Sequence, residues 1–361
     1  SMDVSRIIES LNDAQREAVC ASADPLLVLA GAGSGKTRVL VHRVAWLVDV
    51  EGLSPYSILA VTFTNKAAGE MRGRIEQMIA APATGMWVGT FHGLAHRLLR
   101  SHWQEAQLPQ AFQILDAQDQ QRLVKRVIQA MELDEARWPP RQMQWFINSC
   151  KDEGRRPQHI EHRNDPYLKR QLEIYQAYED LCRRSGLVDF AELLLRSPEL
   201  WLKSPALLDH YRQRFQHILV DEFQDTNTIQ YAWLRMLTGD KARITVVGDD
   251  VQSIYGWRGA RVENIQRFQK DFNNPRVIRL EQNYRSTATI LKAANAVIDN
   301  NAERMGKQLW TEGHDGEPIR LYTAYNEQDE ARYVVDCIED HVDKGGLRSD
   351  IAILYRSNAQ S

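Results

Sequence analysis

The amino-terminal part of the chain contains the sequence Leu26-Leu-Val-Leu-Ala-Gly-Ala-Gly-Ser-Gly-Lys-Thr37. Apolar residues suited to a buried parallel strand lead into three alternate glycines, and residues 38–47 repeat apolar positions at helical spacing. A strand, a glycine-rich loop and a helix in this order predict a phosphate-binding loop, because backbone N–H groups and the helix start face phosphate oxygens. Ala30 stands where the strict pattern has glycine. The alternative is a glycine-rich turn that happens to precede a lysine.

The residue types in this loop suit a bound ATP and Mg²⁺. Lys36 is expected on the β- and γ-phosphates, and Thr37 is expected to offer its hydroxyl to Mg²⁺. The backbone expected around the phosphates belongs to small residues, namely Ala32, Gly33, Ser34 and Gly35. Gln15, shortly before the loop, is a candidate for the adenine edge because a side-chain amide donates and accepts at once. Its alternative role is that of a solvated polar residue.

The composition of the 361 residues is that of an ordinary globular protein, with 43% hydrophobic and 26% charged residues. The length predicts about two to three domains. Neither an apolar run of about 18 residues nor a signal peptide is recognisable, so we predict no membrane span. Four scattered cysteines without a CxxC pair favour a reducing cytoplasm over a disulfide framework or a zinc site. A net charge of −3 gives no general argument for a nucleic-acid partner, so any such site has to be local.

The order of apolar patterns predicts an α/β protein with a parallel sheet and an insertion. Short apolar strands are expected at residues 58–62, 87–89, 217–220, 244–248 and 277–280. Between Leu94 and about Phe215 helical patterns dominate and strands vanish, which predicts an all-helical inserted domain. Near Asn283 the pattern changes and a new part of the chain begins. Strands are expected there at 319–322 and 351–355, on either side of a helix at 327–342. The chain stops just after a predicted strand, so we expect a piece of a longer protein.

The sequence Asp221-Glu222 directly follows one of these apolar strands. Asp221 is expected to hold Mg²⁺, directly or through water. Glu222 is expected to act as the general base that polarises the attacking water, a role worth roughly 10²–10⁴ in rate. An ordinary acidic turn is the alternative, but the phosphate-binding loop earlier in the chain favours the second half of a nucleotide-hydrolysis site.

Two further motifs combine aromatic residues with arginine. Tyr255, Trp257 and Arg258 lie between glycines and suit the stacking of single-stranded nucleic-acid bases, with core packing as the alternative. Phe63 and Phe91, at other strand ends, favour the stacking platform. In Gln282-Asn-Tyr-Arg285, the arginine could reach the γ-phosphate across a cleft and Tyr284 could stack on adenine. Taken alone, this last motif would be a surface turn.

Eight segments appear in an order that resembles the UvrD/Rep/PcrA family of superfamily 1 DNA helicases over nearly the whole chain. They are LNDAQREAV, AGAGSGKT, ILAVTFTNKAA, WVGTFHGLAHRLLR, LVDFAELLLR, ILVDEFQDTN, VVGDDVQSIYGWRGA and LEQNYRS. The resemblance implies a RecA-like first domain at 1–90 and 215–280, a helical insertion at 91–214, and the start of a second RecA-like domain at 281–361. It also implies ATP-driven 3′→5′ translocation on single-stranded DNA, with unwinding at junctions with duplex DNA.

The resemblance further assigns roles to single residues. Gln15, Arg38 and Tyr284 would bind the nucleotide base and its surroundings, and Gln252 and Arg285 would sense the γ-phosphate. The DNA path would be lined by residues of several motifs, namely Phe63, Thr64, His92, Phe190, Tyr255, Trp257 and Arg258. DNA repair of the mismatch or nucleotide-excision type, with unidentified repair proteins as partners on the bacterial nucleoid, follows from the same resemblance.

The sequence departs from the family pattern in two places. Val251 stands where the family usually has a third aspartate, which we expect to be tolerated. The motifs expected later in a second RecA-like domain are absent, so we expect this chain to bind nucleotide weakly and not to unwind DNA. Two other classes stay open: a nucleotide-switch binding module, and a helicase domain fused to a nuclease.

Overall fold

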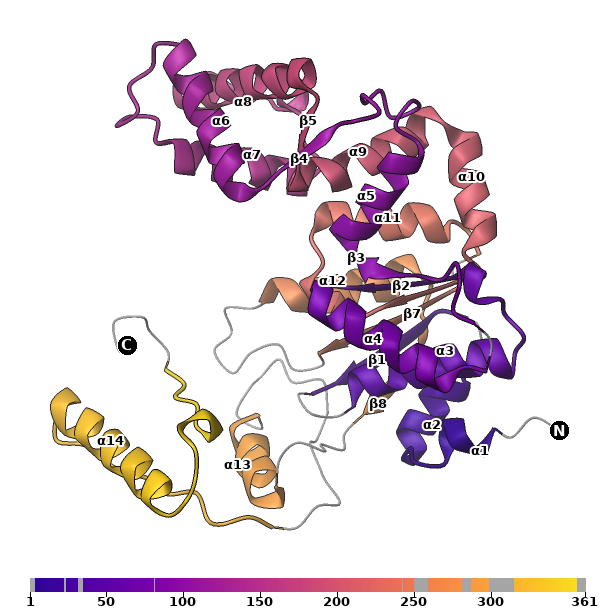
Figure 1. Cartoon of the computed structure of the whole chain (residues 1–361), viewed down its shortest axis with the longest axis vertical. Coiled ribbons are helices and arrows are strands. Elements are labelled where there is room, and N and C mark those ends of the chain that lie inside the picture. The colour runs from indigo at the N-terminus through magenta and orange to yellow at the C-terminus, as the bar shows by residue number, and fades with distance from the viewer. Residues whose placement is uncertain are drawn as a thin grey trace. The chain divides into compact units, whose positions relative to one another are not determined.

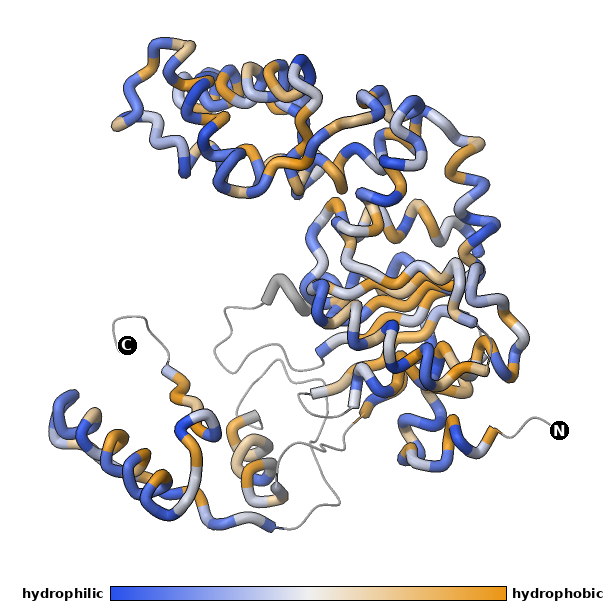
Figure 2. The backbone as a smooth tube through the Cα atoms, viewed as in Figure 1, coloured by the Kyte–Doolittle hydropathy of each residue, from blue (hydrophilic) through white to orange (hydrophobic). Residues whose placement is uncertain are grey.

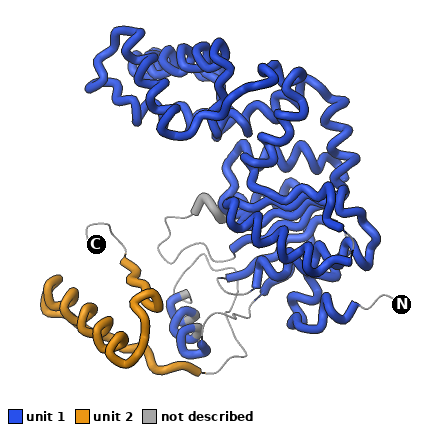
Figure 3. The backbone as a smooth tube through the Cα atoms, viewed as in Figure 1, with its two compact units in different colours: residues 1–314 blue, residues 315–361 orange. Residues whose placement is uncertain are grey.

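The computed structural model describes residues 4–22, 24–31, 35–80, 82–241, 243–249, 259–280, 287–298 and 315–355. The chain divides into two compact units, residues 1–314 and residues 315–361 (Figure 3). The first unit contains the sheet and the helices packed around it. The six strands of this sheet are β1 (Leu26–Ala30), β2 (Ile58–Thr62), β3 (Trp87–Thr90), β6 (His217–Val220), β7 (Ile244–Asp249) and β8 (Arg276–Leu280).

The six strands form one parallel sheet in the order β3-β2-β6-β7-β1-β8. Parallel sheets are covered on both faces, which is why most of these strands are apolar almost throughout. Every residue of β1, β2 and β6 is buried. The predicted parallel α/β sheet and each of its predicted strands are confirmed (Figure 1).

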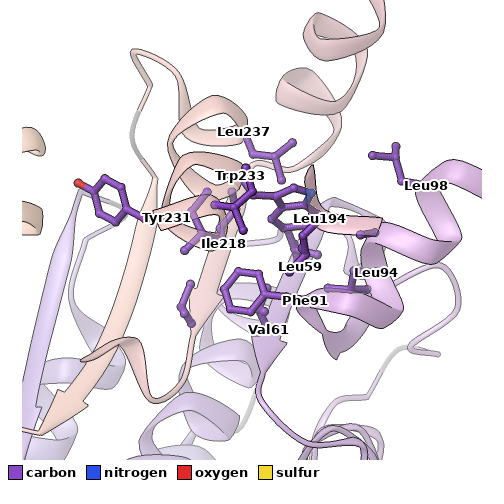
Figure 4. Packing of buried hydrophobic residues seen from close by; sticks show 14 of the residues in the cluster. Leu59, Val61, Phe91, Leu94, Leu98, Leu194, Ile218, Tyr231, Trp233 and Leu237 are labelled. Atoms are coloured by element: carbon purple, nitrogen blue, oxygen red, sulfur yellow. The ribbon is translucent and has the colours of Figure 1, made fainter. Parts of the chain in front are cut away.

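Alternate residues of the strands point to opposite faces, and each face has its own helices. One face packs against α1 (Ser5–Ile8), α2 (Asp13–Cys20), α3 (Lys36–Asp49) and α4 (Asn65–Met78). The other face packs against α5 (Phe91–Ser101), α9 (Phe190–Lys203), α11 (Thr228–Thr238) and α12 (Gly259–Asp271). Figure 2 shows the sheet as a hydrophobic layer, and Figure 4 shows the packing around Phe91 and Trp233 on the second face.

The inserted segment consists mainly of helices. In addition to α5 and α9 it contains α6 (Ala117–Ala130), α7 (Pro140–Asp152), α8 (Pro166–Ser185) and α10 (Pro205–Arg214). The predicted apolar face of α6, which includes Leu123 and Val127, lies in a separate core with residues of α7 and α8. The prediction that strands vanish here is wrong, because β4 (Gln113–Leu115) and β5 (Leu187–Asp189) form a small parallel ladder. Strands of three residues are too short to show an alternating pattern.

Short 3₁₀ turns and two more helices complete the described elements. The turns lie at Pro55–Ser57, Pro157–His159, Phe223–Asp225 and Arg348–Asp350, and the helices are α13 (Ala288–Ile298) and α14 (Glu327–Asp343). The strands predicted at 319–322 and 351–355 are wrong for the described residues, because neither segment has a partner in a ladder. Leu321 and Leu354 are each 94% exposed there. In the part of the chain that is described, no helix is both long and apolar enough to cross a membrane.

Candidate nucleotide site

Three neighbouring strands end in polar residues at one edge of the sheet. β1 leads into the glycine-rich loop, β6 is followed by Asp221, and β7 ends at Asp249. Because β6, β7 and β1 are adjacent and parallel, their carboxyl ends lie together, which is where open α/β sheets bind ligands. The pairing of β1 with β7 places Asp249 beside Ala30, the last residue before the loop. This edge is the candidate nucleotide site.

Lys36 begins α3 and points to the acidic strand ends. Gly35, the residue before it, has a φ of 84°, in the left-handed region that favours glycine. The Lys36 Nζ lies 2.5 Å from Oδ1 of Asp249 and 3.5 Å from Oε1 of Glu222. Burial alone would lower the pKa of Lys36, but the charge of Asp249 and its hydrogen bond outweigh burial, so the pKa is raised. The ammonium group is therefore kept charged at the site's centre.

The two predicted acidic residues differ in their surroundings. Asp221 is buried, and its Oδ1 accepts a hydrogen bond of 2.9 Å from the Glu222 backbone N–H. Burial, followed by the nearby Glu222 charge, raises the pKa of Asp221 to about 6, against the opposing effect of Lys36. Glu222 has a φ of 51°, a left-handed conformation rare for residues with a side chain. Its side chain is 38% exposed, so its carboxylate is accessible to a water molecule.

A buried amide connects the acidic groups. Gln224 Nε2 donates to Glu222 Oε2 at 2.7 Å and to Asp249 Oδ2 at 3.2 Å, and Gln224 Oε1 accepts from the Asp249 N–H at 3.0 Å. Gly248 gives this amide its space, since a Cβ there would lie 3.0 Å from Gln224 Oε1. Gln224 therefore fixes the orientation of Glu222 relative to β7.

Asp249 and Gln224 are site residues that our sequence prediction missed. Asp249 follows an apolar strand just as Asp221 does, and this shared position was the signal that could have identified it. Gln224 gave no such signal, because its role comes from contacts between β7 and the turn after β6.

The predicted Mg²⁺ ligands suit that ion by chemistry. Thr37 is the second residue of α3 and would offer a hydroxyl oxygen, and Asp221 would offer a carboxylate oxygen. The described residues contain no group of three or more His, Cys, Asp or Glu side chains arranged to hold a metal by themselves. Mg²⁺ commonly takes one or two protein ligands and completes its shell with phosphates and water. The donors therefore fit a Mg²⁺ ion that arrives with a nucleotide.

The predicted adenine residue lies in a helix that is anchored to α3. Gln15 is fully buried, and its Oε1 accepts the Asn12 N–H at 3.1 Å in a capping box. Arg43 of α3 donates to three carbonyls at the end of the same helix α2, at 2.9–3.1 Å, and burial lowers its pKa to about 10. Arg38 donates to the Ser10 carbonyl at 3.2 Å. The roles of Gln15 and Arg38 toward the base stay predictions.

Two residues predicted on the DNA path are brought together by the structure. His92 of α5 and Phe190, the first residue of α9, meet edge to face with their centroids 6.3 Å apart. Phe190 is 48% exposed, and burial lowers the pKa of His92, so its ring is neutral at physiological pH. Thr64 caps α4 by accepting the Ala67 N–H at 3.1 Å. The exposed ring of Phe190 can stack on a nucleic-acid base.

The proposed contribution of Phe91 to the stacking platform is wrong. Phe91 is 1% exposed and packs edge to face against Phe63, with a centroid distance of 5.5 Å. It also packs edge to face against Trp233 at 5.9 Å (Figure 4). The start of α5 turns this ring inward, where it joins the core. Phe63, which is half-buried, keeps part of its ring accessible.

Several predicted site residues lie outside the described residues. They are Ala32, Gly33 and Ser34 of the loop, together with Gln252, Tyr255, Trp257, Arg258, Tyr284 and Arg285. Their roles stay predictions.

A lysine at the start of a helix, facing acidic ends of adjacent parallel strands, defines an α/β protein of the nucleoside-triphosphate-binding class. Comparison with known families is more specific. Residues 11–273 match the UvrD/REP helicase N-terminal domain, and residues 278–361 match the UvrD-like helicase C-terminal domain. The chain therefore belongs to the UvrD/REP helicase family.

Individual relatives are similar over the whole chain. It is 66% identical over 360 residues to DNA helicase II of Escherichia coli strain K12, and 58% identical over 364 residues to DNA helicase II of Haemophilus influenzae. It is 43% identical over 356 residues to the ATP-dependent DNA helicase PcrA of Staphylococcus epidermidis. These alignments cover 98–100% of this chain but only 49–50% of the relatives. The chain thus spans about half the length of the relatives it matches.

Proposed function

We propose that this chain forms the ATP-hydrolysing part of a 3′→5′ DNA helicase that translocates on single-stranded DNA and acts in DNA repair. The observation that carries the proposal is the position of Lys36 between Asp249 and Glu222 at the carboxyl edge of the sheet. The names of its relatives, DNA helicase II and ATP-dependent DNA helicase PcrA, support ATP and DNA as ligands. We propose the domain bounds 1–90 with 215–280, 91–214 and 281–361.

The proposed chemistry assigns one task to each residue. Lys36 contacts the β- and γ-phosphates, and releases Asp249 and Glu222 as it does so. Glu222, held by Gln224, accepts a proton from the attacking water as general base. Thr37 and Asp221 would hold Mg²⁺, which when bound would neutralise charge on the phosphates. Gln252 and Arg285 are proposed to contact the γ-phosphate.

The proposed DNA path passes over the aromatic residues of the same unit. Phe190 offers an exposed ring beside His92, and Phe63 offers part of its ring. Each stacked base contributes about 1–3 kcal/mol without selecting a sequence, as a translocating protein requires. Tyr255, Trp257, Arg258 and Thr64 complete the proposed path.

The test is the rate of ATP hydrolysis with and without single-stranded DNA, in this chain and in a protein of the relatives' full length that contains it. We expect Glu222→Gln to lower the rate by about 10²–10⁴, because the amide cannot accept the proton of water. Glu173→Gln, the same change on an exposed residue of α8, is the matched control and should leave the rate unchanged. Unchanged hydrolysis in Glu222→Gln would refute the role of the base.

The same measurement separates the helicase from a nucleotide-switch module. A switch should show no stimulation of hydrolysis by single-stranded DNA in the longer protein, whereas a translocase should show it. We also expect this chain alone to bind nucleotide weakly and to lack strand separation. Detectable unwinding of a tailed duplex by the 361 residues alone would contradict that expectation.

A further inference from the structure

A group of paired charges, buried at its centre and partly exposed at Arg196 and Glu199, lies in the inserted segment, away from the nucleotide site. We name it the α9 charge cluster, and its members are Lys151, Arg156, Glu179, Asp189, Glu192, Arg196 and Glu199. They come from α7, the turn after it, α8, β5 and α9. None of the proposed steps of ATP hydrolysis uses them.

Asp189 is the central acceptor of the cluster. It ends β5 and caps α9, where its Oδ1 accepts the Glu192 N–H at 2.7 Å. Its Oδ2 accepts from Lys151 Nζ at 2.8 Å, from the Tyr178 hydroxyl at 2.6 Å and from Gln120 Nε2 at 3.3 Å. One carboxylate therefore connects the start of α9 to α6, α7 and α8.

Each charge next to Asp189 has an oppositely charged partner. Lys151 has a side chain only 2% exposed, and its Nζ also lies 3.0 Å from Glu192 Oε1. Arg156 binds both oxygens of Glu192, at 2.7 Å each. Burial alone would lower the pKa of Lys151, but the Asp189 and Glu192 charges outweigh burial and raise it. Such a bidentate, fully paired arrangement restricts the first turn of α9 to one orientation.

The first turn of α9 sets the direction of the Phe190 side chain. Phe190 directly follows the Asp189 cap, so its Cα–Cβ bond leaves the helix at an angle that the cap fixes. Phe190 is 48% exposed, so packing does not hold its side chain as it would hold a core residue, and its ring meets that of His92. The buried polar contacts thus end next to an accessible aromatic ring.

We propose that Asp189 and Lys151 are positioning residues that hold Phe190 beside His92 for stacking on a DNA base. This inference rests on the proposed function, because it takes Phe190 as part of the DNA path. Buried ion pairs add little stability compared with apolar residues of the same size, whereas they impose a defined geometry when every donor and acceptor is paired. The ion pair of Lys151 with Asp189 then serves mainly to set the direction in which the Phe190 side chain leaves α9.

The first readout is the Cε1–H NMR signal of His92 in the 361-residue chain with ¹³C-labelled histidine, assigned with His92→Gln. The ring current of Phe190 acts on this signal, so it reports the arrangement of the two rings in the folded state. We expect Lys151→Met to shift or broaden it. We expect the double variant Asp189→Asn with Lys151→Met to restore most of the signal, because Asn keeps the cap acceptor and no buried charge remains unpaired. The remaining difference should match the loss of the acceptor for Tyr178 and Gln120. Asp189→Ala with Lys151→Met lacks the cap acceptor and should not restore the signal.

The second readout is the affinity for a fluorescent oligothymidine, measured by anisotropy. We expect Phe190→Ala and Lys151→Met each to weaken binding about tenfold, the loss of roughly one stacked base, and the Asn-containing double variant to recover. Tyr178→Phe removes a single hydrogen bond to Asp189, and it replaces Lys151→Met in both measurements if Lys151→Met does not fold. It should shift the His92 signal in the same direction by a smaller amount.

The outcomes separate this inference from the proposed function. A lower urea midpoint in Lys151→Met with an unchanged His92 signal and unchanged DNA affinity would mean that the cluster only stabilises the fold, and would overturn the inference. If Phe190→Ala leaves DNA affinity unchanged, or the wild-type chain binds no DNA, the proposed DNA path fails. In that case the His92 signal still decides whether the cluster orients Phe190.

Discussion

Two lysines of this chain each lie between two carboxylates, in very different surroundings. Lys36 pairs with Asp249 and Glu222, whose side chains are 29% and 38% exposed. Lys151 pairs with Asp189 and Glu192, whose side chains are 1% and 9% exposed. The residue types are the same, but only the first pair of carboxylates is accessible to solvent.

This difference separates a binding site from a positioning device. The partners of Lys36 are partly hydrated, so exchanging them for phosphate oxygens leaves no carboxylate buried without compensation. The partners of Lys151 are buried and also accept hydrogen bonds from Tyr178 and Arg156, so loss of the lysine leaves uncompensated charge in the interior. The edge of the sheet therefore suits the exchange of ligands, and the α9 charge cluster suits a fixed geometry.

The largest expected effect tests this contrast directly through one substitution made at both sites. Lys151→Met should lower the free energy of unfolding by about 3–5 kcal/mol, the usual cost of removing one partner of a buried ion pair. Lys36→Met should change it by at most about 1 kcal/mol, because its carboxylates remain hydrated. Urea unfolding followed by circular dichroism measures both. Equal losses in the free energy of unfolding at Lys36 and Lys151 would show that the exposure of their carboxylate partners does not distinguish the two sites.

Much of the nucleotide edge could be predicted from the sequence because its signals are local. The loop that ends in Lys36 and the pair Asp221-Glu222 each follow an apolar strand directly. Asp249 reaches Lys36 only through the register between β1 and β7, which joins residues far apart in the chain. Phe91 was misassigned because its position at a strand end does not reveal which way the first turn of α5 faces.

The α9 charge cluster could not be predicted by reading apolar patterns. Lys151 and Asp189 are charged residues on buried faces, and helical periodicity treats such positions as solvent-exposed. The ladder of β4 with β5 was missed for a related reason, since three residues show no period. Conversely, residues 319–322 have an apolar pattern typical of a strand but form no ladder among the described residues. Whether such a short segment forms a strand depends on its pairing partners and not on its local composition.

A smaller effect extends the contrast to a buried group without an opposite charge. His217 is the first residue of β6 and is fully buried, with its Nε2 2.9 Å from the Thr245 hydroxyl. Burial followed by the charges of Arg43 and Arg243 lowers its pKa well below the usual value. The folded state cannot take up the proton that the unfolded state binds below about pH 6.5. The contribution of His217 to stability is therefore complete above that pH and is lost as the pH falls.

The measurement is urea unfolding at pH 7.5 and pH 5.5. Between these values wild type should lose about 1.4 kcal/mol more than His217→Leu, which has no imidazole to titrate. The Thr245 hydroxyl keeps its hydrogen bond from Arg43 Nε, at 2.7 Å, in that variant. An identical pH dependence of stability in both proteins would show that burial does not lower the pKa of His217 in the folded state.

The smallest effect is expected for an exposed pair of the same inserted segment. Arg170 and Glu173 of α8 approach to 2.8 Å, with side chains 44% and 41% exposed. Because water solvates both groups before and after folding, Arg170→Gln should cost about 0.5 kcal/mol or less, and the difference should vanish in 1 M NaCl, where the screening length is about 3 Å. The loss in Lys151→Met should persist in the same salt, because ions do not reach a side chain that is 2% exposed. If salt removed both losses alike, access to solvent would not be what distinguishes the α9 charge cluster from the protein surface, and the contrast between Lys36 and Lys151 would need another physical basis.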